Sequence, residues 1–159
     1  FPKDLGDAMA GRVRFLDESH SVIFTDKGIQ FFSTRVETSP ELVSQIPIEE
    51  NIRSITYAQD KVGIVTDNVE GGDPYRLRIY DREGSPVFEK PFNYQYTGFD
   101  IDGDLVLLYN DSSCKVYNMT GTEKYNGTFD FTVSKVSAGR FPGTLLVMGP
   151  QKMTEIKLQ

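Results

Sequence analysis

The stretch Ile79–Gly84, which reads IYDREG, returns further along the chain as Val116–Gly121, which reads VYNMTG. The tyrosines of the two copies, Tyr80 and Tyr117, are 37 residues apart. This spacing is close to the ~40 to 45 residues of a four-stranded propeller blade. Each copy ends in a turn that begins with Asp or Asn and closes with Gly, residues that suit tight turns between strands. The pattern therefore predicts a repeated β-structure.

The repeat extends outward from this turn over Ile52–Asp130. Four short strand-like runs recur in the same order. The runs of the first copy are Arg53–Tyr57, Lys61–Asn68, Arg76–Gly84 and Val87–Lys90, and those of the second are Thr97–Ile101, Asp104–Asp111, Lys115–Gly121 and Lys124–Gly127. No window of about ten residues keeps apolar side chains at helical spacing. The sequence predicts an all-β fold, a β-propeller or partial propeller of about four blades, each a four-stranded antiparallel meander.

The blades of this single propeller-like domain, residues 1–159, are expected at residues 8–50, 51–92, 93–131 and 132–159. In the first blade, Pro47 predicts an edge strand because proline cannot donate to a hydrogen-bond ladder. The loop that precedes this strand, Thr38–Glu41, contains Pro40, which could open one turn of helix. A β-sandwich is the rival architecture, but a sandwich does not require the repeated Tyr-Asp/Asn-x-x-Gly turn.

The fourth repeat lacks the run that would form its outer strand, because it stops in Met153–Leu158. We expect Phe1–Leu5 to complete this blade, or else another chain or residues outside this sequence to complete the ring. Propellers hold about four to eight blades, so four are few for a closed ring. A homodimer that completes a larger ring, or a portion of a larger propeller, is expected. Because Phe1 is not a natural start, we expect an excised or processed piece, with room for a membrane anchor outside it.

Composition narrows the classes of partner. With 38% hydrophobic and 25% charged residues, the 159-residue chain can bury a sizeable core. The formal net charge of −6 and the lack of a Lys or Arg run argue against nucleic acid as a partner. The only cysteine, Cys114, lies in an apolar run and is expected to fill the sheet. No stretch approaches the ~18 apolar residues of a membrane span.

An aspartate-rich segment resembles part of a calcium loop. Asp100, Asp102 and Asp104 alternate along it, but Gly103 and Ser112 stand where an EF-hand would have different residues. A hairpin turn at Asp102–Gly103 explains the same residues, because this dipeptide favours the required backbone conformation. We therefore predict a turn and no metal site.

Candidate catalytic groups are few. The single histidine, His20, lies beside two serines in a predicted turn, without a nucleophile motif or a neighbouring ordered carboxylate. Glu49 and Glu50 are adjacent, so their side chains would point to opposite faces and could not flank one glycosidic bond. We predict no catalytic residue, no metal and no cofactor.

Loops at one end of the blades are the predicted binding surface. In a propeller meander, the loops joining second and third strands lie on the same face as the loops joining successive blades. The residues predicted to bind there are Glu49, Glu50, Asn51, Asp67, Glu70, Asp73, Tyr94, Tyr96 and Asp111. Aromatic side chains surrounded by carboxylates suit a basic or polar partner. The plainer interpretation is a set of polar turns with two core tyrosines.

The Tyr80-Asp-x-x-Gly84 turn, followed by Pro86-Val-Phe88, resembles the repeat of quinoprotein-like and WD40-like propellers. In particular, the pattern resembles an uncharacterised family of membrane-anchored extracytoplasmic β-propeller proteins from Gram-positive anaerobes. The resemblance implies an extracytoplasmic or cell-surface location in a bacterium. The chain has no Trp, so it lacks the Trp-Asp dipeptide of WD40 repeats and the tryptophan docking repeat of quinoprotein dehydrogenases, and no quinone cofactor is expected.

The function expected from these patterns is a non-enzymatic module that binds a protein or a cell-surface glycan. The alternative is a carbohydrate-active hydrolase or lyase on a propeller scaffold, since one fold can host many activities. A third interpretation is a purely structural module of a larger surface protein. An enzyme should show titratable groups that converge near the ring centre, and this sequence offers few.

Overall fold

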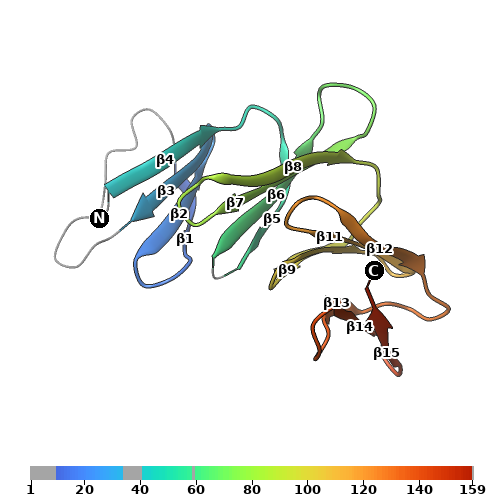
Figure 1. Ribbon diagram of the computed structural model, residues 1–159. Helices are drawn as coiled ribbons and strands as arrows, with labels where there is room; N and C mark the ends of the chain where they lie inside the picture. The colour runs from blue at the N-terminus through green and yellow to red at the C-terminus, as the bar shows by residue number, and fades with distance from the viewer. Residues whose placement is uncertain (1–9, 34–40, 59, 159) are drawn as a thin grey trace. The chain divides into compact units, whose positions relative to one another are not determined.

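The computed structural model describes residues 10–33, 41–58 and 60–158. Over these residues the regular secondary structure consists of β-strands, arranged in four antiparallel sheets (Figure 1). The chain divides into two compact units, unit 1 at Phe1–Pro91 and unit 2 at Phe92–Gln159. The predicted fold class is confirmed: each sheet is a meander of three or four strands.

Unit 1 holds two four-stranded sheets. Sheet A consists of β1 (Ala10–Phe15), β2 (His20–Thr25), β3 (Gly28–Ser33) and β4 (Glu41–Pro47), and sheet B of β5 (Ile52–Tyr57), β6 (Lys61–Asp67), β7 (Tyr75–Asp81) and β8 (Pro86–Phe92). In both sheets the strands pair in chain order. Pro47 lies in an edge strand, as predicted, while the predicted loop at Thr38–Glu41 lies largely outside the described residues.

Unit 2 holds one four-stranded and one three-stranded sheet. Sheet C consists of β9 (Gly98–Asp102), β10 (Leu105–Tyr109), β11 (Ser113–Asn118) and β12 (Glu123–Thr128), and sheet D of β13 (Lys135–Ala138), β14 (Thr144–Met148) and β15 (Met153–Lys157). Among the described residues, sheet D ends at β15. The predicted role of Phe1–Leu5 as a fourth strand falls on residues outside the described ones.

The repeated turn has the same hydrogen bonds in both copies. The side-chain oxygen of Asp81 accepts bonds from the backbone N–H groups two and four residues later, both at 2.9 Å, and Asn118 does the same at 3.0 Å. The third residue after each is a glycine with positive φ, 87° at Gly84 and 82° at Gly121. A side chain at that φ would meet the backbone, which explains why glycine recurs there.

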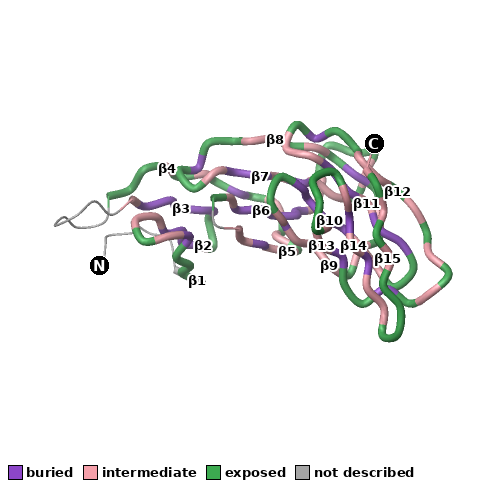
Figure 2. Tube along the Cα trace, turned by 60° about the horizontal axis from the view of Figure 1, so that its bottom comes forward, coloured by how far each residue is buried: buried purple, intermediate pink, exposed green. Residues whose placement is uncertain are grey.

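Apolar residues from neighbouring sheets form the core of each unit. In unit 1 the core joins sheets A and B through residues that include Phe24, Phe31, Val62, Ile64 and Tyr80. In unit 2 it joins sheets C and D through residues that include Leu105, Leu107, Val116, Leu145 and Val147. The buried residues follow the inner strands, while β4 is largely exposed (Figure 2). Successive sheets therefore pack face to face within each unit.

Candidate functional site

The loops at one end of unit 1 hold six of the nine predicted binding residues. The connection from sheet A to sheet B meets the β6–β7 loop where the backbone N–H of Asp67 donates to the carbonyl of Asn51, at 3.0 Å. Glu50 lies in the same connection, and Glu70 and Asp73 lie in the β6–β7 loop. Within that loop, Asn68 Nδ2 donates to the carbonyl of Asp73, at 2.8 Å.

Arginines on the strands neutralise most of these carboxylates. Asp67 accepts a bond from Arg53 Nε at 2.6 Å, and Arg76 Nη2 donates to Glu70 at 2.8 Å. Arg78 forms an ion pair with Glu50, at 3.0 Å between Nη2 and Oε2. Three carboxylates at this loop end are therefore paired with arginines. The surface is less acidic than the carboxylates in the sequence suggested. Glu49, the sixth predicted residue of unit 1, is exposed in the same connection.

Unit 2 brings together three further predicted residues. Asn110 Nδ2 donates to the carbonyl of Gln95 at 2.7 Å, which holds the segment before β9 against the β10–β11 loop. The Tyr94 hydroxyl lies 2.7 Å from Ser113 Oγ. Because the Ser113 hydroxyl donates to Asn110 Oδ1 at 3.0 Å, the tyrosine must be the donor of the pair. Asp111 is exposed at the tip of the same loop.

The two predicted tyrosines have different environments. Burial raises the pKa of the Tyr94 hydroxyl above its ordinary value, so it stays protonated and donates to Ser113 at neutral pH. Tyr96 packs between aromatic rings, with centroids 6.1 Å from Phe92 and 6.4 Å from Phe99. Both tyrosines are half-buried, so neither stands free in solvent. The exposed residues around them are Asn93, Gln95 and Thr97.

The expectation that all nine residues form one face stays a prediction, because they belong to different units. Within each unit, the connection between blades does meet the loop between second and third strands. The arginine partners were not predicted from the sequence. The alternation Arg76-x-Arg78 is a signal for them, since it places two cations on one face of β7.

A second polar cluster surrounds Asp17, which the sequence analysis did not select. The Asp17 carboxylate accepts bonds from the Ser19 backbone N–H at 2.8 Å and from Arg82 Nη1 at 2.8 Å. His20 Nδ1 lies 2.9 Å from the same carboxylate. Burial acts to raise the pKa of Asp17, but the bonds from Ser19, His20 and Arg82 together hold the pKa of this carboxyl well below its usual range. The cluster joins sheet A to the β7–β8 turn of sheet B.

This cluster corrects two expectations about His20. The residue begins β2 instead of lying in a turn, and an ordered carboxylate does lie beside it. The arrangement still differs from a catalytic triad, because Ser19 Oγ and Asp17 Oδ1 both contact Nδ1, at 3.1 and 2.9 Å. A triad needs the hydroxyl on one ring nitrogen and the carboxylate on the other. The geometry therefore supports a structural clasp.

The aspartate-rich segment forms a hairpin, as predicted. Asp102 pairs with Leu105 across a turn in which Gly103 has φ 61°. Asp102 Oδ2 accepts a bond from the Ala138 backbone N–H at 2.9 Å, which ties sheet C to sheet D. Among the described residues, no group of three or more His, Cys, Asp or Glu side chains is placed to hold a metal ion. Nor does the described part of the chain include a helix that is long and apolar enough to cross a membrane.

Known structures share this fold at low sequence identity. Hsv2 from Kluyvelomyces marxianus is 13% identical with a TM-score of 0.59, over 98% of this chain and 50% of that chain. BBS1N in complex with ARL6DN is 11% identical with a TM-score of 0.52, over 95% and 52%. The computationally designed Ika4 protein is 10% identical with a TM-score of 0.55, over 100% of both chains. The chain thus spans about half the length of Hsv2 and BBS1N.

The structural neighbours are β-propellers, so the four sheets are the blades of a β-propeller or of part of one. No curated protein matches the sequence. A family model, by contrast, matches residues 2–158, almost the whole chain. The chain belongs to the family of unknown function DUF5711.

Proposed function

We propose that the chain is a non-catalytic propeller module that binds a protein through the loop surface of unit 2. This surface consists of residues 93–97 and 110–113. The observation that carries the proposal is that hydrogen bonds join these two segments. Asn110 bonds to Gln95, and Tyr94 bonds to Ser113. A loop held in place before binding loses less conformational entropy when a partner docks.

The chemistry of this surface suits a polar or basic partner. Asp111 is exposed at its tip, and Asn93, Gln95 and Thr97 are exposed along its side. Tyr94 adds a half-buried aromatic ring whose hydroxyl is already bonded. Exposed polar groups around a fixed aromatic are typical of protein interfaces. The propeller BBS1N, which has been solved in complex with ARL6DN, supports a protein as the partner.

We propose three further properties. From the sequence resemblance, the module works outside the cytoplasm or on the cell surface of a bacterium, attached to the membrane by an anchor outside this segment. A cell-surface glycan is the second class of ligand. Two copies form a homodimer that completes a larger ring, because propellers hold about four to eight blades.

The test is capture of partners by the immobilised chain from proteins and glycans released from bacterial cell surfaces. Asp111→Lys reverses the charge at the tip without touching the core, so it is expected to abolish capture while the thermal midpoint stays unchanged. Tyr94→Phe removes only the hydroxyl bond to Ser113 and should weaken capture less. Glu49→Lys, in unit 1, is the matched charge-reversal control. Capture that survives Asp111→Lys and is lost in Glu49→Lys would move the site to unit 1.

A further inference from the structure

The segments that enter sheets C and D can be matched residue by residue, because each forms the same backbone hydrogen bond with its sheet. Thr97 N–H donates to the carbonyl of the last residue of β10 at 2.8 Å, and Ser134 N–H donates to the carbonyl of the last residue of β14 at 2.7 Å. Tyr94 lies three residues before Thr97, and Phe131 lies three residues before Ser134. Phe131 therefore takes the place in sheet D that Tyr94 has in sheet C.

The loops that follow the second strands of these sheets match in the same way. Asn110 N–H donates to the Ser113 carbonyl at 3.0 Å, and Gly149 N–H donates to the Lys152 carbonyl at 2.7 Å. Lys152 thus takes the place of Ser113. In sheet C the Tyr94 hydroxyl bonds to Ser113 Oγ and joins the two segments. Phenylalanine has no hydroxyl and the lysine side chain has no acceptor, so the matching pair in sheet D cannot form this bond.

A cavity of about 220 Å³ lies where the two segments of sheet D meet. Lys152 Nζ lies 5.2 Å from the centroid of the Phe131 ring and 3.4 Å from Asp130 Oδ1. The residues that line the cavity are Phe131, Thr132, Gly149, Pro150, Gln151 and Lys152. The cavity is therefore a feature of the entering segment and the β14–β15 loop.

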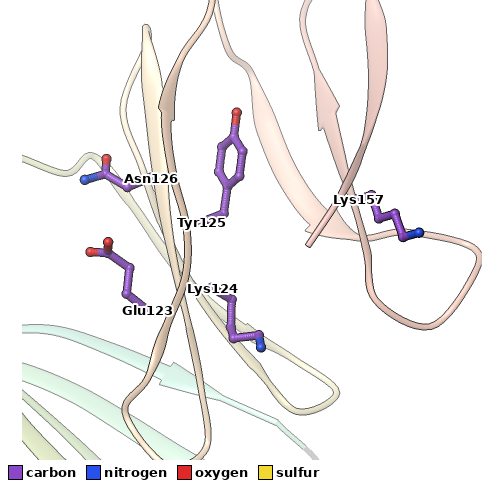
Figure 3. A pocket seen from close by; sticks show the side chains of 5 residues that line it. All are labelled: Glu123, Lys124, Tyr125, Asn126 and Lys157. Carbon is purple, nitrogen blue, oxygen red and sulfur yellow. The ribbon is translucent and has the colours of Figure 1, made fainter. Parts of the chain in front are cut away.

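The Phe131 ring is held in position by its neighbours. Its centroid lies 5.5 Å from that of Phe129, and the Phe129 ring stacks on Tyr125 at 6.3 Å with 20° between the planes. Tyr125 lies on the side of β12 nearer β15 (Figure 3). On the loop side, a Cβ added at Gly149 would lie 2.8 Å from Phe131 Cδ2. A wall that is fixed before binding loses less conformational entropy when a ligand docks.

Two exposed carboxylates belong to the segments around this cavity. Asp130 directly precedes Phe131, and its only printed partner is the exposed Lys152. The Asp111 carbonyl accepts a bond from Val133 N–H at 2.9 Å, so the tip of the β10–β11 loop contacts the segment that contains Phe131. The Asp111 side chain is exposed and forms no ion pair with a described residue. A cation bound here would therefore meet one unpaired carboxylate.

We propose that this cavity receives an aromatic side chain of the partner protein, and that a basic residue next to it in the partner pairs with Asp111 and Asp130. The inference rests on the function proposed above, because Asp111 belongs to the loop surface of unit 2. The incoming ring would lie against Phe131 and Pro150. The Lys152 ammonium favours a ring over an aliphatic side chain, because only a ring offers a π face to a cation. The basic residue would complement the charge of the exposed carboxylates.

The probe is a short synthetic peptide with a central Trp-Arg pair flanked by glycine and serine. The chain has no tryptophan, so the emission of the peptide reports binding without background. The emission should shift to shorter wavelength, and the shift should saturate as the chain is added. A Trp-Glu peptide should bind about two- to fivefold more weakly, the range expected for an exposed ion pair. An Ala-Arg peptide should not compete.

Phe131→Tyr combined with Lys152→Ser rebuilds in sheet D the pair that joins the loops of sheet C. This double variant should bind the Trp-Arg peptide about tenfold more weakly, because the tyrosine hydroxyl closes the cavity and the cation is lost. Gln151→Ala is the matched control and should bind as the unaltered chain does, since Gln151 offers neither a ring nor a charge. If the double variant fails to fold, Lys152→Ser alone changes only an exposed side chain and should weaken binding about two- to fivefold.

Four results would overturn the inference. The first is the absence of a saturable emission shift up to the solubility limit of the Trp-Arg peptide. The second is equal affinity of the unaltered chain and the folded double variant, and the third is equal binding of the Trp-Arg and Trp-Glu peptides. The fourth is self-association in light scattering that the double variant abolishes, because a second copy of the chain would then fill the cavity.

The same experiments separate this inference from the proposed function. If Asp111→Lys abolishes partner capture but the Trp-Arg peptide does not bind, the loop surface stands and the cavity is not part of it. If the peptide binds and the double variant weakens it, while capture survives Asp111→Lys, the cavity is a binding site and the proposed loop surface is wrong.

Discussion

The second strands of sheets C and D have similar sequences but different surroundings. In β10, Leu105, Val106, Leu107 and Leu108 are all buried. In β14, Leu145 and Val147 are fully buried, but Leu146 and Met148, which point to the opposite face, are only half-buried. Both strands are runs of apolar residues, yet only in β10 are residues of both faces buried.

The difference shows that an apolar run does not by itself determine how deeply a strand is buried. An apolar run is expected wherever neighbours cover both faces of a sheet. The sequence of β14 is such an apolar run. Among the described residues, however, the outer face of sheet D carries half-buried Leu146 and Met148 beside Met153, which is 65% exposed. This face is where the homodimer proposed above, or a further blade, would pack.

Truncation of a leucine on each strand gives the largest expected contrast. Leu108→Ala should lower the free energy of unfolding by about 2 to 5 kcal/mol, because Leu108 is fully buried and leaves a cavity. Leu146→Ala should cost about 1 kcal/mol or less, because this side chain is already partly exposed to water. Urea denaturation measures both, with an unchanged m value as the sign that the unfolded state is the same.

A similar cost for both leucines would break the comparison, because it would mean that the outer face of sheet D is covered in solution. Repeating the urea denaturation over a range of protein concentrations tests whether a second copy of the chain covers this face. Only association between chains makes the cost of Leu146→Ala depend on concentration.

Two hairpin glycines give the next contrast. An added Cβ at Gly84 would lie 2.7 Å from Phe31 Cδ1 and 2.8 Å from Ser44, whereas at Gly103 nothing lies within 4 Å. Both residues have positive φ. Gly84→Ala should therefore destabilise by about 2 to 4 kcal/mol, from the backbone conformation and the overlap together.

Gly103→Ala should cost only about 1 to 2 kcal/mol, the backbone contribution alone. Thermal unfolding of the two variants measures the difference. Equal effects would show that the β7–β8 turn does not press on sheet A in solution.

The Asp17 clasp is expected to make a smaller contribution that depends on pH. The pKa of Asp17 is lowered in the folded chain, so its stabilisation is fully present above the unfolded pKa of about 4 and is lost as pH falls below that value. Asp17→Asn should cost about 1 to 2 kcal/mol at neutral pH, a modest figure because Arg82 is 49% exposed.

The difference in stability between the unaltered chain and Asp17→Asn should shrink as pH falls below about 4. Glu83→Gln is the matched control, since Glu83 lies 3.8 Å from His20 Nε2 and is 60% exposed. A difference that stays constant down to acid pH would mean that the clasp does not bind the carboxylate in its charged form.

Local features of the fold could be predicted from the sequence because they depend on residues close together in the chain. The repeated turn needs Asp81 or Asn118 and a glycine three residues later, so its pattern is visible directly. The strand-like runs predicted at 53–57, 61–68, 76–84 and 87–90 correspond to the strands at 52–57, 61–67, 75–81 and 86–92. Alternating or continuous apolar runs between turns account for this agreement.

Contacts between strands could not be predicted in the same way. The pairing of Arg53 with Asp67 depends on the register of two strands, and the bond from Arg82 to Asp17 depends on how sheet B packs on sheet A. The one-sided burial of β14 depends on which sheet lies next to it. The sequence therefore predicted which loops form the candidate site. It did not predict that arginines neutralise several of the carboxylates there.

The smallest expected effect concerns Cys114, which lies in the core between sheets C and D. The thiol is fully buried, and burial raises its pKa to about 12. The thiolate is the reactive form, so a disulfide reagent at mildly alkaline pH should label Cys114 only when the chain unfolds. In a Cys114→Ala background, Leu146→Cys should be labelled quickly, because it lies on the open face of sheet D.

The raised pKa of Cys114 also fixes the direction of a stability effect. The neutral thiol is favoured in the folded chain, so its stabilisation is fully present below the unfolded value of about 9 and is lost as pH rises toward about 12. Cys114→Ala should therefore reduce the loss of unfolding free energy at alkaline pH. Burial also raises the pKa of tyrosines such as Tyr109, so their ionisation contributes to the loss that is left. Rapid labelling of Cys114 in the folded chain would instead show that sheets C and D separate on the timescale of the reaction. In that case the core of unit 2 would be as open as the outer face of sheet D, and the contrast between β10 and β14 would not hold in solution.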